Sequence, residues 1–256
     1  MAWLSLIPVA RLVCGLPMIV DIDIGNTHAK WRLSLAGSVV ERGVLDTRCK
    51  DWVALQSLRS YQPERIRVSN VAGSDVAERV RQITAKAFGL EVEFATASGA
   101  VGEVVSGYAE PEKLGVDRWL ALLAGWALFG NRCVVVDAGS ALTFDFLDEQ
   151  GRHLGGYIIP GRQMMLNSLF GGTSGVRAGA SQAQGLSYGQ NTDAAVQNGC
   201  LAMTIALIEK MLSAEGPGMT DLVLTGGDAE SLLMYLPSSV VHIPDLVLDG
   251  LALALP

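Results

Sequence analysis

Short apolar runs alternate with amphipathic stretches along most of this chain of 256 residues. The apolar runs are rich in β-branched residues and are bounded by Gly, Asn or Asp, which predicts strands joined by turns. Single strands are predicted at 39–44, 65–69, 91–94, 152–159 and 222–225, and strand–turn–strand units at 18–33 and 134–147. Helical spacing and helix-start signals predict helices at 51–60, 74–88, after Gly115, and at 160–169, 191–212 and 246–255. This alternation is typical of an α/β protein.

The unit at 18–33 combines an apolar strand with a polar turn. Asp21 and Asp23 are two residues apart in the strand and therefore point to the same face. Two carboxylates on a buried strand require a cation or strong hydrogen-bond donors. The turn and the next strand supply groups that could hold a metal-bound polyphosphate, namely Gly25, Asn26, Thr27 and Lys30. The alternative for this motif taken alone is an Asx-rich hairpin turn without a ligand.

The polar turn occurs twice in the chain. Residues 134–147 repeat the order of β-branched run, Asp, small residue, Gly, polar residue and alternating strand, and Asp137 follows Asp23 by 114 residues. Because that separation is about one small domain, the repeat predicts two similar domains that face one another across a cleft. A third turn, at Gly226 and Gly227, follows a predicted strand and precedes a helix.

A further acidic residue stands at the start of a predicted helix. Asp117 and Arg118 fall in the first helical turn after Gly115. One interpretation is structural, because an aspartate there interacts with the helix dipole and contributes about 0.3–1 kcal/mol. The other is a catalytic carboxylate. The Gly- and Ser-rich stretch 97–111 before this helix is the predicted linker between domains.

Composition and charge narrow the class of protein. The formal net charge is −7 and no block of Lys or Arg stands out, which argues against non-specific binding to nucleic acid or anionic membranes. Hydrophobic residues make up 50% of the chain, so apolar surface for self-association is expected. The four cysteines lack metal-ligand spacing, which indicates reduced thiols in a cytoplasmic protein. Residues 1–17 lack a basic start and are too short to span a membrane, so we interpret them as an N-terminal extension before a native start at Met18, or as a loosely attached segment.

These motifs, taken in order, closely resemble those of type III pantothenate kinases, within the acetate kinase/sugar kinase/Hsp70/actin superfamily. The resemblance runs from Met18 to the C-terminus and includes Gly-Val-Asp-Arg at 115–118, Gly-Gly-Tyr-Ile-Ile-Pro-Gly at 155–161 and Thr-Gly-Gly-Asp at 225–228. It implies an α/β fold of duplicated ribonuclease H-like (actin-like ATPase) domains with a central cleft. Residues 18–113 would form the N-terminal domain and 114–256 the C-terminal domain, with the last helix packed back on the first domain.

The resemblance also implies an activity, which is ATP-dependent phosphorylation of pantothenate to 4′-phosphopantothenate, the first step of coenzyme A biosynthesis. Asp117 corresponds to the general base, Asp23 to a residue near the Mg²⁺ that ATP carries, and Asp137 to the site of a monovalent cation, K⁺ or NH₄⁺. The other ATP- and phosphate-binding positions are Gly25, Asn26, Thr27, Lys30, Gly139, Ser140, Thr143, Gly226 and Gly227. The substrate-binding positions are Tyr108, Gly115, Val116, Asp117, Arg118 and Thr173. The family is dimeric, so the implied partners are ATP, pantothenate and a second copy of the chain, with no nucleic acid and no membrane.

Two other functions remain open at this point. One is a non-catalytic, regulatory homologue of the transcription accessory factor type, which would keep the fold without the chemistry. The intact acidic, lysine and glycine positions and the negative charge argue against it. The other is a different small-molecule kinase or an exopolyphosphatase of the same superfamily, against which the short chain and the Gly-Val-Asp-Arg motif argue.

Overall fold

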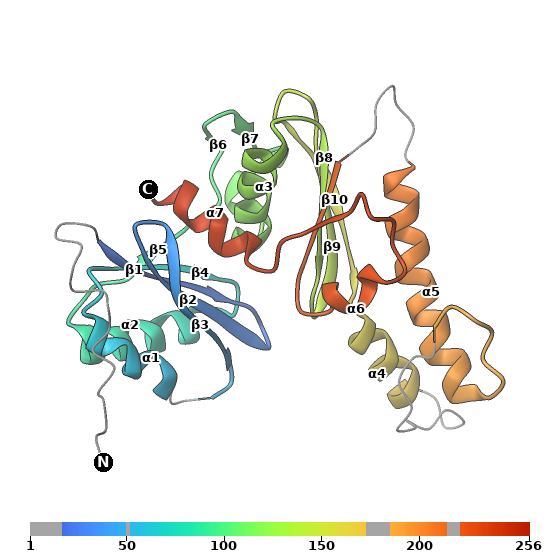
Figure 1. Cartoon of the computed structure of the whole chain (residues 1–256), viewed down its shortest axis with the longest axis horizontal. Helices are drawn as coiled ribbons and strands as arrows, with labels where there is room; N and C mark the ends of the chain where they lie inside the picture. Colours follow the sequence, from blue (N-terminus) through green and yellow to red (C-terminus); the bar gives the residue numbers. More distant parts are fainter. Residues whose placement is uncertain (1–16, 50–51, 173–184, 214–220) are drawn as a thin grey trace, which may run out of the picture. The chain divides into compact units, whose positions relative to one another are not determined.

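The computed structural model describes residues 17–49, 52–172, 185–213 and 221–256 (Figure 1). They divide into two compact units, and neither unit is one continuous segment. The first contains the described residues up to Ala97 together with Leu114–Leu120 and Val247–Pro256. The second contains Ser98–Lys113 and the described residues of Ala121–Leu246. The expectation about residues 1–17 lies outside the described residues, apart from Pro17.

The first unit is built on a five-stranded sheet with the strand order β3-β2-β1-β4-β5. Its first three strands are antiparallel neighbours, and β4 and β5 are added parallel to β1. The strands are β1 (Met18–Ile24), β2 (His28–Leu35), β3 (Ser38–Asp46), β4 (Arg65–Asn70) and β5 (Glu93–Phe94). One face is covered by α1 (Val53–Ser57), the 3-10 helix η2 (Leu58–Tyr61) and α2 (Ser74–Phe88), and the other by α7 (Leu246–Ala254) (Figure 1).

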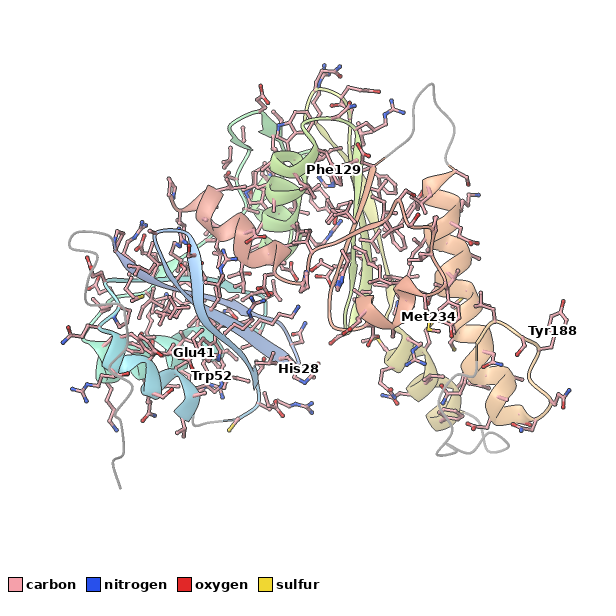
Figure 2. The ribbon with its side chains drawn as sticks, in the orientation of Figure 1. His28, Glu41, Trp52, Phe129, Tyr188 and Met234 are labelled. Atoms are coloured by element: carbon pink, nitrogen blue, oxygen red, sulfur yellow. The ribbon has the colours of Figure 1, made fainter. Side chains whose placement is uncertain are left out.

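The two faces of this sheet differ in polarity because neighbouring side chains of a strand point in opposite directions. The apolar face packs under α1 and α2, where Figure 2 shows the fully buried Trp52. The core side chains there include Val20, Ile22, Ile24, Leu55, Ile66 and Val80. The opposite face of β1 carries Asp21 and Asp23. Candidate chemistry is thus confined to one side of the sheet.

The second unit repeats the same arrangement, with the strand order β10-β9-β8-β11-β12. Its strands are β8 (Cys133–Ala138), β9 (Ala141–Leu147), β10 (His153–Pro160), β11 (Asp221–Thr225) and β12 (Val241–His242). The helices that follow these strands are α4 (Arg162–Gly172), α5 (Thr192–Leu212) and α6 (Ala229–Leu233). Side chains of α5 and α6 form a buried core with one face of the sheet. On the other face, Gly125 of α3 (Val116–Phe129) lies against Val135 of β8.

The repeated strand order confirms the duplicated ribonuclease H-like fold expected from the two polar turns. The predicted helix at 74–88 matches α2, and the helix predicted to begin after Asn191 is α5. Asn191 caps α5, since its side chain accepts a hydrogen bond from the backbone N–H of Ala194. The stretch 97–111 was expected to be a linker, but it contains a small hairpin, β6 (Ala100–Val101) and β7 (Val104–Val105), followed by the 3-10 helix η3 (Pro111–Lys113).

No helix in the described ranges is both long enough and apolar enough to cross a bilayer. Cys133 and Cys200 are buried free thiols, and burial raises the pKa of Cys133 to about 12. Cys49 is exposed.

Candidate functional site

The first polar turn, in the first unit, connects β1 to β2 and is held by backbone hydrogen bonds. The N–H of Gly25 donates to the carbonyl of His28 at 3.0 Å. Thr47 braces the turn from outside, because its hydroxyl donates to the carbonyl of Gly25 at 2.8 Å and its N–H donates to the carbonyl of Thr27 at 3.0 Å. Asn26 at the tip is exposed. The turn therefore presents its polar tip in a fixed backbone conformation.

Asp23 lies at the polar face of the sheet, next to the turn. It stands directly opposite Lys30 on β2 and beside Ser69 on β4 in the strand register. Opposed residues on neighbouring strands project to the same face, so the carboxylate, the ammonium group and the hydroxyl share one side. Asp23 and Lys30 are half-buried, whereas Ser69 is fully buried. This side of β1 thus offers a carboxylate and a cation at the base of a turn that could bind phosphate.

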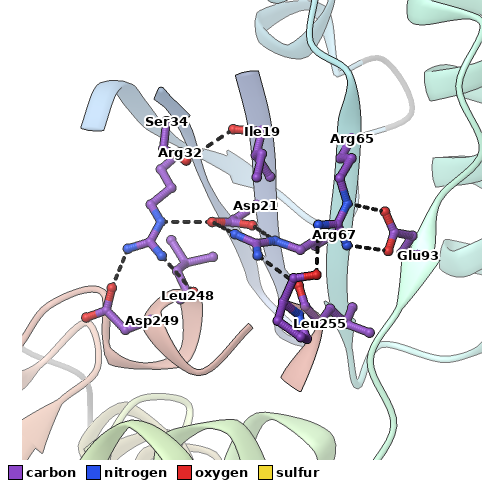
Figure 3. Close-up of polar contacts among 11 residues, drawn as sticks. Ile19, Asp21, Arg32, Ser34, Arg65, Arg67, Glu93, Leu248, Asp249 and Leu255 are labelled. Atoms are coloured by element: carbon purple, nitrogen blue, oxygen red, sulfur yellow. Dashed lines mark hydrogen bonds and ion pairs between the residues drawn. The ribbon is translucent and has the colours of Figure 1, made fainter. Parts of the chain in front are cut away.

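Asp21, two residues earlier, has a different environment (Figure 3). It is completely buried and accepts hydrogen bonds from Arg67, at 2.7 and 3.1 Å, and from Arg32, at 3.1 Å. Arg32 also bonds to Asp249 and to the carbonyl of Leu248 in α7. The sequence required donors for a buried carboxylate, and here two arginines supply them. Asp21 thus belongs to a polar cluster that holds α7 against the sheet.

Asp117 lies in the first turn of α3, within the first unit. Its carboxylate folds back over Gly115, where a Cβ would lie 2.7 Å from Oδ1. The same oxygen accepts a hydrogen bond of 2.8 Å from the backbone N–H of Arg118. Asp117 is half-buried and Arg118 is buried. A side chain at position 115 would displace this carboxylate. The position of Asp117 fits both the helix-dipole and the catalytic interpretation.

The second polar turn, in the second unit, is contiguous with the Gly-Gly turn after β11. Asp137 lies beside Thr143 on β9 and beside Thr225 on β11. A Cβ on Gly226 would lie 2.5 Å from Oδ1 of Asp137 and 2.4 Å from the carbonyl of Ala138, and Gly226 has a φ of +99°. Glycine is thus required at 226 by both space and backbone conformation. A hydrogen bond of 2.8 Å from the N–H of Asp228 to the carbonyl of Ala138 joins the two turns.

A third segment of the second unit lies beside the second polar turn. The N–H of Gly161 donates to the carbonyl of Ser140 at 3.0 Å, and a Cβ on Gly161 would lie 2.2 Å from the carbonyl of Gly139. Arg162 follows at the start of α4, and its charge partly offsets the effect of burial, which raises the pKa of Asp228. The small depression formed by these segments is lined by Ala138, Gly139, Leu142, Gly161, Arg162, Thr204, Asp228 and Leu232. It offers backbone groups and a cation beside the second turn.

The predicted residues thus fall into separate groups. The first unit contains Asp23, Lys30 and Asp117, and the second contains Tyr108, Asp137 and the glycines of the later turns. Thr173 lies outside the described residues. In the part of the chain that the structure describes, no three His, Cys, Asp or Glu side chains form a group that could hold a metal ion.

Sequence reasoning did not assign several residues that hold or line these turns, namely Thr47, Gly161, Arg162 and Asp228. Gly161 and Asp228 belong to motifs that were recognised, so their motifs were an available signal. No sequence signal pointed to Thr47, because it lies on a later segment and reaches Gly25 only in the folded sheet.

Comparison with known proteins shows the family. The profile of type III pantothenate kinases matches residues 19–214. The type III pantothenate kinase of Ectopseudomonas mendocina is 37% identical over 248 residues, covering 93% of this chain and 99% of that protein. That of Alcanivorax borkumensis is 37% identical over 241 residues, covering 91% of this chain and 97% of its own.

Solved structures show the fold. A Campylobacter jejuni protein assigned to the Baf family of transcriptional activators has a TM-score of 0.60 at 22% identity, covering 91% of this chain and 95% of its own. A Sinorhizobium meliloti protein assigned as a 2-dehydro-3-deoxygalactonokinase has a TM-score of 0.54 at 15% identity, covering 92% and 97%. Because its sequence matches the family profile over most of its length and curated members over nearly all of it, this protein belongs to the type III pantothenate kinase family.

Proposed function

We propose that this protein transfers the γ-phosphoryl group of ATP to pantothenate and forms 4′-phosphopantothenate, the first step of coenzyme A biosynthesis. The observation that carries the proposal is the family membership. Phosphoryl transfer asks a protein mainly to position the reactants and to neutralise charge. The two polar turns and the carboxylate of Asp117 are suited to those tasks.

ATP would bind through the two polar turns. Backbone N–H groups of the turns and the ammonium group of Lys30 would meet the phosphates, and the Gly226-Gly227 turn would lie against the adenosine. Gly139, Ser140 and Thr143 would contribute from the second turn. The tight packing of Gly226 on the backbone of Ala138, and of Gly161 on the backbone of Gly139, supports this, since it leaves no room for bulky side chains at either position.

Two cations accompany ATP in this proposal. Mg²⁺ prefers oxygen ligands, and the half-buried carboxylate of Asp23 beside Ser69 is chemically suited to hold it together with the phosphates. The ion, when bound, would neutralise the charge that develops on the transferred group. Asp137 would serve the monovalent cation, K⁺ or NH₄⁺. Its carboxylate lies in a cradle between Gly139 and Gly226, near the carbonyl of Ala138, which is an oxygen-rich environment.

Asp117 would accept the proton of the pantothenate hydroxyl as the phosphoryl group is transferred. Asp117→Asn is therefore expected to lower kcat by at least about 100-fold, the lower range for a positioned acid–base group, with ATP binding retained. The matched control is Asp75→Asn, because Asp75 also lies in the first turn of a helix, α2. Equal activity of the two variants would show that Asp117 acts only on the helix dipole.

Lys30 would act on the nucleotide alone. Lys30→Ala is expected to raise the KM for ATP by more than the KM for pantothenate, since the ammonium group would contact phosphate. Lys86→Ala, at the end of α2, is the control for loss of a lysine in the same unit. An unchanged KM for ATP in Lys30→Ala would remove this residue from the site.

A homodimer in the cytoplasm completes the proposal. Large apolar side chains are exposed on the second unit, and Figure 2 shows Tyr188, which is 98% exposed, pointing away from the ribbon. Others on β10, α4 and α5 are Leu154, Tyr157, Ile158, Met164, Leu169 and Met203. Exposed apolar side chains in such numbers are typical of a surface that binds another protein, and a second copy of this chain is the partner that the family implies.

The decisive experiment is mass detection of the product from ATP, Mg²⁺, K⁺ and pantothenate. Formation of 4′-phosphopantothenate by the wild type, and its loss in Asp117→Asn, would support the proposal. ATP hydrolysis that does not respond to pantothenate, or phosphorylation of another acceptor in a screen, would refute it. Binding of ATP with no turnover of any acceptor would favour a regulatory homologue instead.

A further inference from the structure

A buried histidine–aspartate pair lies in the second unit and has no part in the reaction described above. His153, the first residue of β10, and Asp145 on β9 are joined by a contact of 3.0 Å between Nε2 and Oδ1. The two residues are only 3% and 1% exposed. The other ring nitrogen, Nδ1 of His153, is buried and has no hydrogen-bond partner in the described ranges. A buried pair of polar residues at this place needs a reason, since apolar side chains would fill the space at less cost.

Tyr108 stacks on the ring of His153. The ring centroids are 5.8 Å apart and the ring planes differ by 14°, which lies within the range of offset stacking. Two backbone contacts place the segment that carries Tyr108 beside the start of β10 and the turn before it. The N–H of Val105 donates to the carbonyl of Gly151 at 3.0 Å, and a Cβ on Gly107 would lie 1.9 Å from the carbonyl of His153. Tyr108 itself is half-buried. The half-buried ring of Tyr108 therefore packs on the buried ring of His153.

The hydrogen bond to Asp145 explains why the residue that Tyr108 stacks on is a histidine. The terminal χ2 torsion of an aromatic side chain has a broad energy profile, so packing alone defines a ring plane loosely. A carboxylate that bonds one ring nitrogen fixes both the tautomer and the orientation of an imidazole. The fixed imidazole plane then sets the plane of the tyrosine stacked on it.

We propose that His153, held by Asp145, is a positioning residue that fixes the ring of Tyr108 as a wall of the pantothenate site. The inference rests on the proposed function, in which Tyr108 contacts pantothenate. His153 acts through Tyr108 and does not itself touch the substrate. Loss of the His153 ring therefore impairs binding of pantothenate and leaves the use of ATP unchanged.

Two substitutions separate this role from a merely structural one. His153→Gln keeps a donor near Asp145 but removes the ring, whereas His153→Phe keeps a ring but leaves Asp145 without this donor. We expect His153→Gln to raise the KM for pantothenate by about tenfold, the factor that corresponds to loss of one aromatic pair, and His153→Phe to raise it less. The KM for ATP stays within about twofold in both, an allowance for ordinary non-additivity. The thermal stability follows the opposite order, because His153→Phe leaves a buried carboxylate short of a hydrogen bond.

The less stable variant is thus expected to bind pantothenate better. A KM for pantothenate that follows the order of stability, or that changes in neither variant, would overturn the inference. Tyr108→Ala supplies the second arm. In that background His153→Gln is expected to change the KM for pantothenate no further, because coupled residues are non-additive. Independent, multiplying effects would show that His153 does not act through Tyr108.

The wild-type protein provides a readout that needs no variant enzyme to fold. With ring-labelled histidine and tyrosine, the NMR signals of His153 and Tyr108 are expected to shift together when pantothenate is added without ATP. The signals of His28 and His242 are the internal controls. A shift of neither ring would overturn the inference even if both His153 variants were insoluble. Failure of the wild type to phosphorylate pantothenate would instead refute the proposed function, and the two failures are therefore distinguishable.

Discussion

Removal of Arg67 provides a strong test of how the first unit is stabilised. Arg67 donates two hydrogen bonds to Asp21, at 2.7 and 3.1 Å, and one of 2.9 Å to the carbonyl of Leu255 (Figure 3). Asp21 has no exposed surface. Arg67→Met keeps much of the side-chain volume but leaves Asp21 with Arg32 as its remaining side-chain donor within the described residues. The substitution therefore leaves a buried carboxylate insufficiently compensated.

The size of the effect follows from burial. Removing one partner of a buried ion pair typically costs about 3–5 kcal/mol, which is a large share of the stability of a domain. Arg65 is the matched control because it lies two residues away on β4, binds Glu93 through two hydrogen bonds and donates to the carbonyl of Pro256. The Arg65 and Glu93 side chains are 31% and 40% exposed, so water screens this pair. Arg65→Met is expected to cost less than about 1 kcal/mol.

The assay is urea unfolding followed by far-UV circular dichroism, with the free energy of unfolding taken from the midpoint and the slope. The expected result is a much larger loss for Arg67→Met than for Arg65→Met. The double variant Asp21→Leu/Arg67→Met is expected to recover part of the loss, because it removes the uncompensated charge as well. Equal losses in the two single variants, or no recovery in the double variant, would refute the view that the cost arises from burying Asp21.

Three further outcomes are expected. Gly226→Ala is expected to abolish ATP use, because Gly226 has a φ of +99° and an added Cβ would overlap neighbouring backbone. Gly227 has open space around it, so Gly227→Ala is expected to retain a near-normal KM for ATP. Similar KM values for ATP in the two variants would contradict the role assigned to the turn. Burial raises the pKa of Asp228 above its ordinary value of 3.8, so the ionised side chain destabilises the folded state as pH rises through its folded pKa. Asp228→Asn is therefore expected to raise the melting temperature at pH 7 relative to wild type and to lose that advantage near about pH 3, below the ordinary pKa; a gain independent of pH would contradict this cause. Ile158→Lys is expected to convert a dimer into monomers in light scattering, whereas Val44→Lys, equally exposed at 61% but in the first unit, is expected to leave the assembly intact. Monomeric wild type would contradict the proposed dimer.

Secondary structure was predictable wherever local signals agreed. The amphipathic spacing at 74–88 corresponds to α2, and Asn191 caps α5, because both signals lie within a few residues of one another in the sequence. The hairpin of β6 and β7 was missed. Its strands are two residues each, too short to show any periodicity, and its second strand is held by the contact between Val105 and Gly151.

The sequence was also informative about the glycines of the candidate site. Gly226 was assigned from its motif, and the structure adds the reason, which is a positive φ and a carbonyl where a Cβ would lie. The supporting residues were less accessible. Thr47 and His153 carry no local signal, because each acts on a segment that is remote in sequence and close only in the folded sheet.

Asp21 and Asp23 show most clearly which properties cannot be inferred from the sequence. The alternation of β1 determined by itself that both carboxylates share one face and that both need partners. It could not determine that Asp21 is the buried, structural residue, because its partners come from β2 and β4 and the cluster is closed by α7, 217 residues beyond Arg32. Periodicity is set by neighbouring residues and is visible in any short window. The environment of a charge is set by whichever distant segments exclude water from it, and only the tertiary structure decides that.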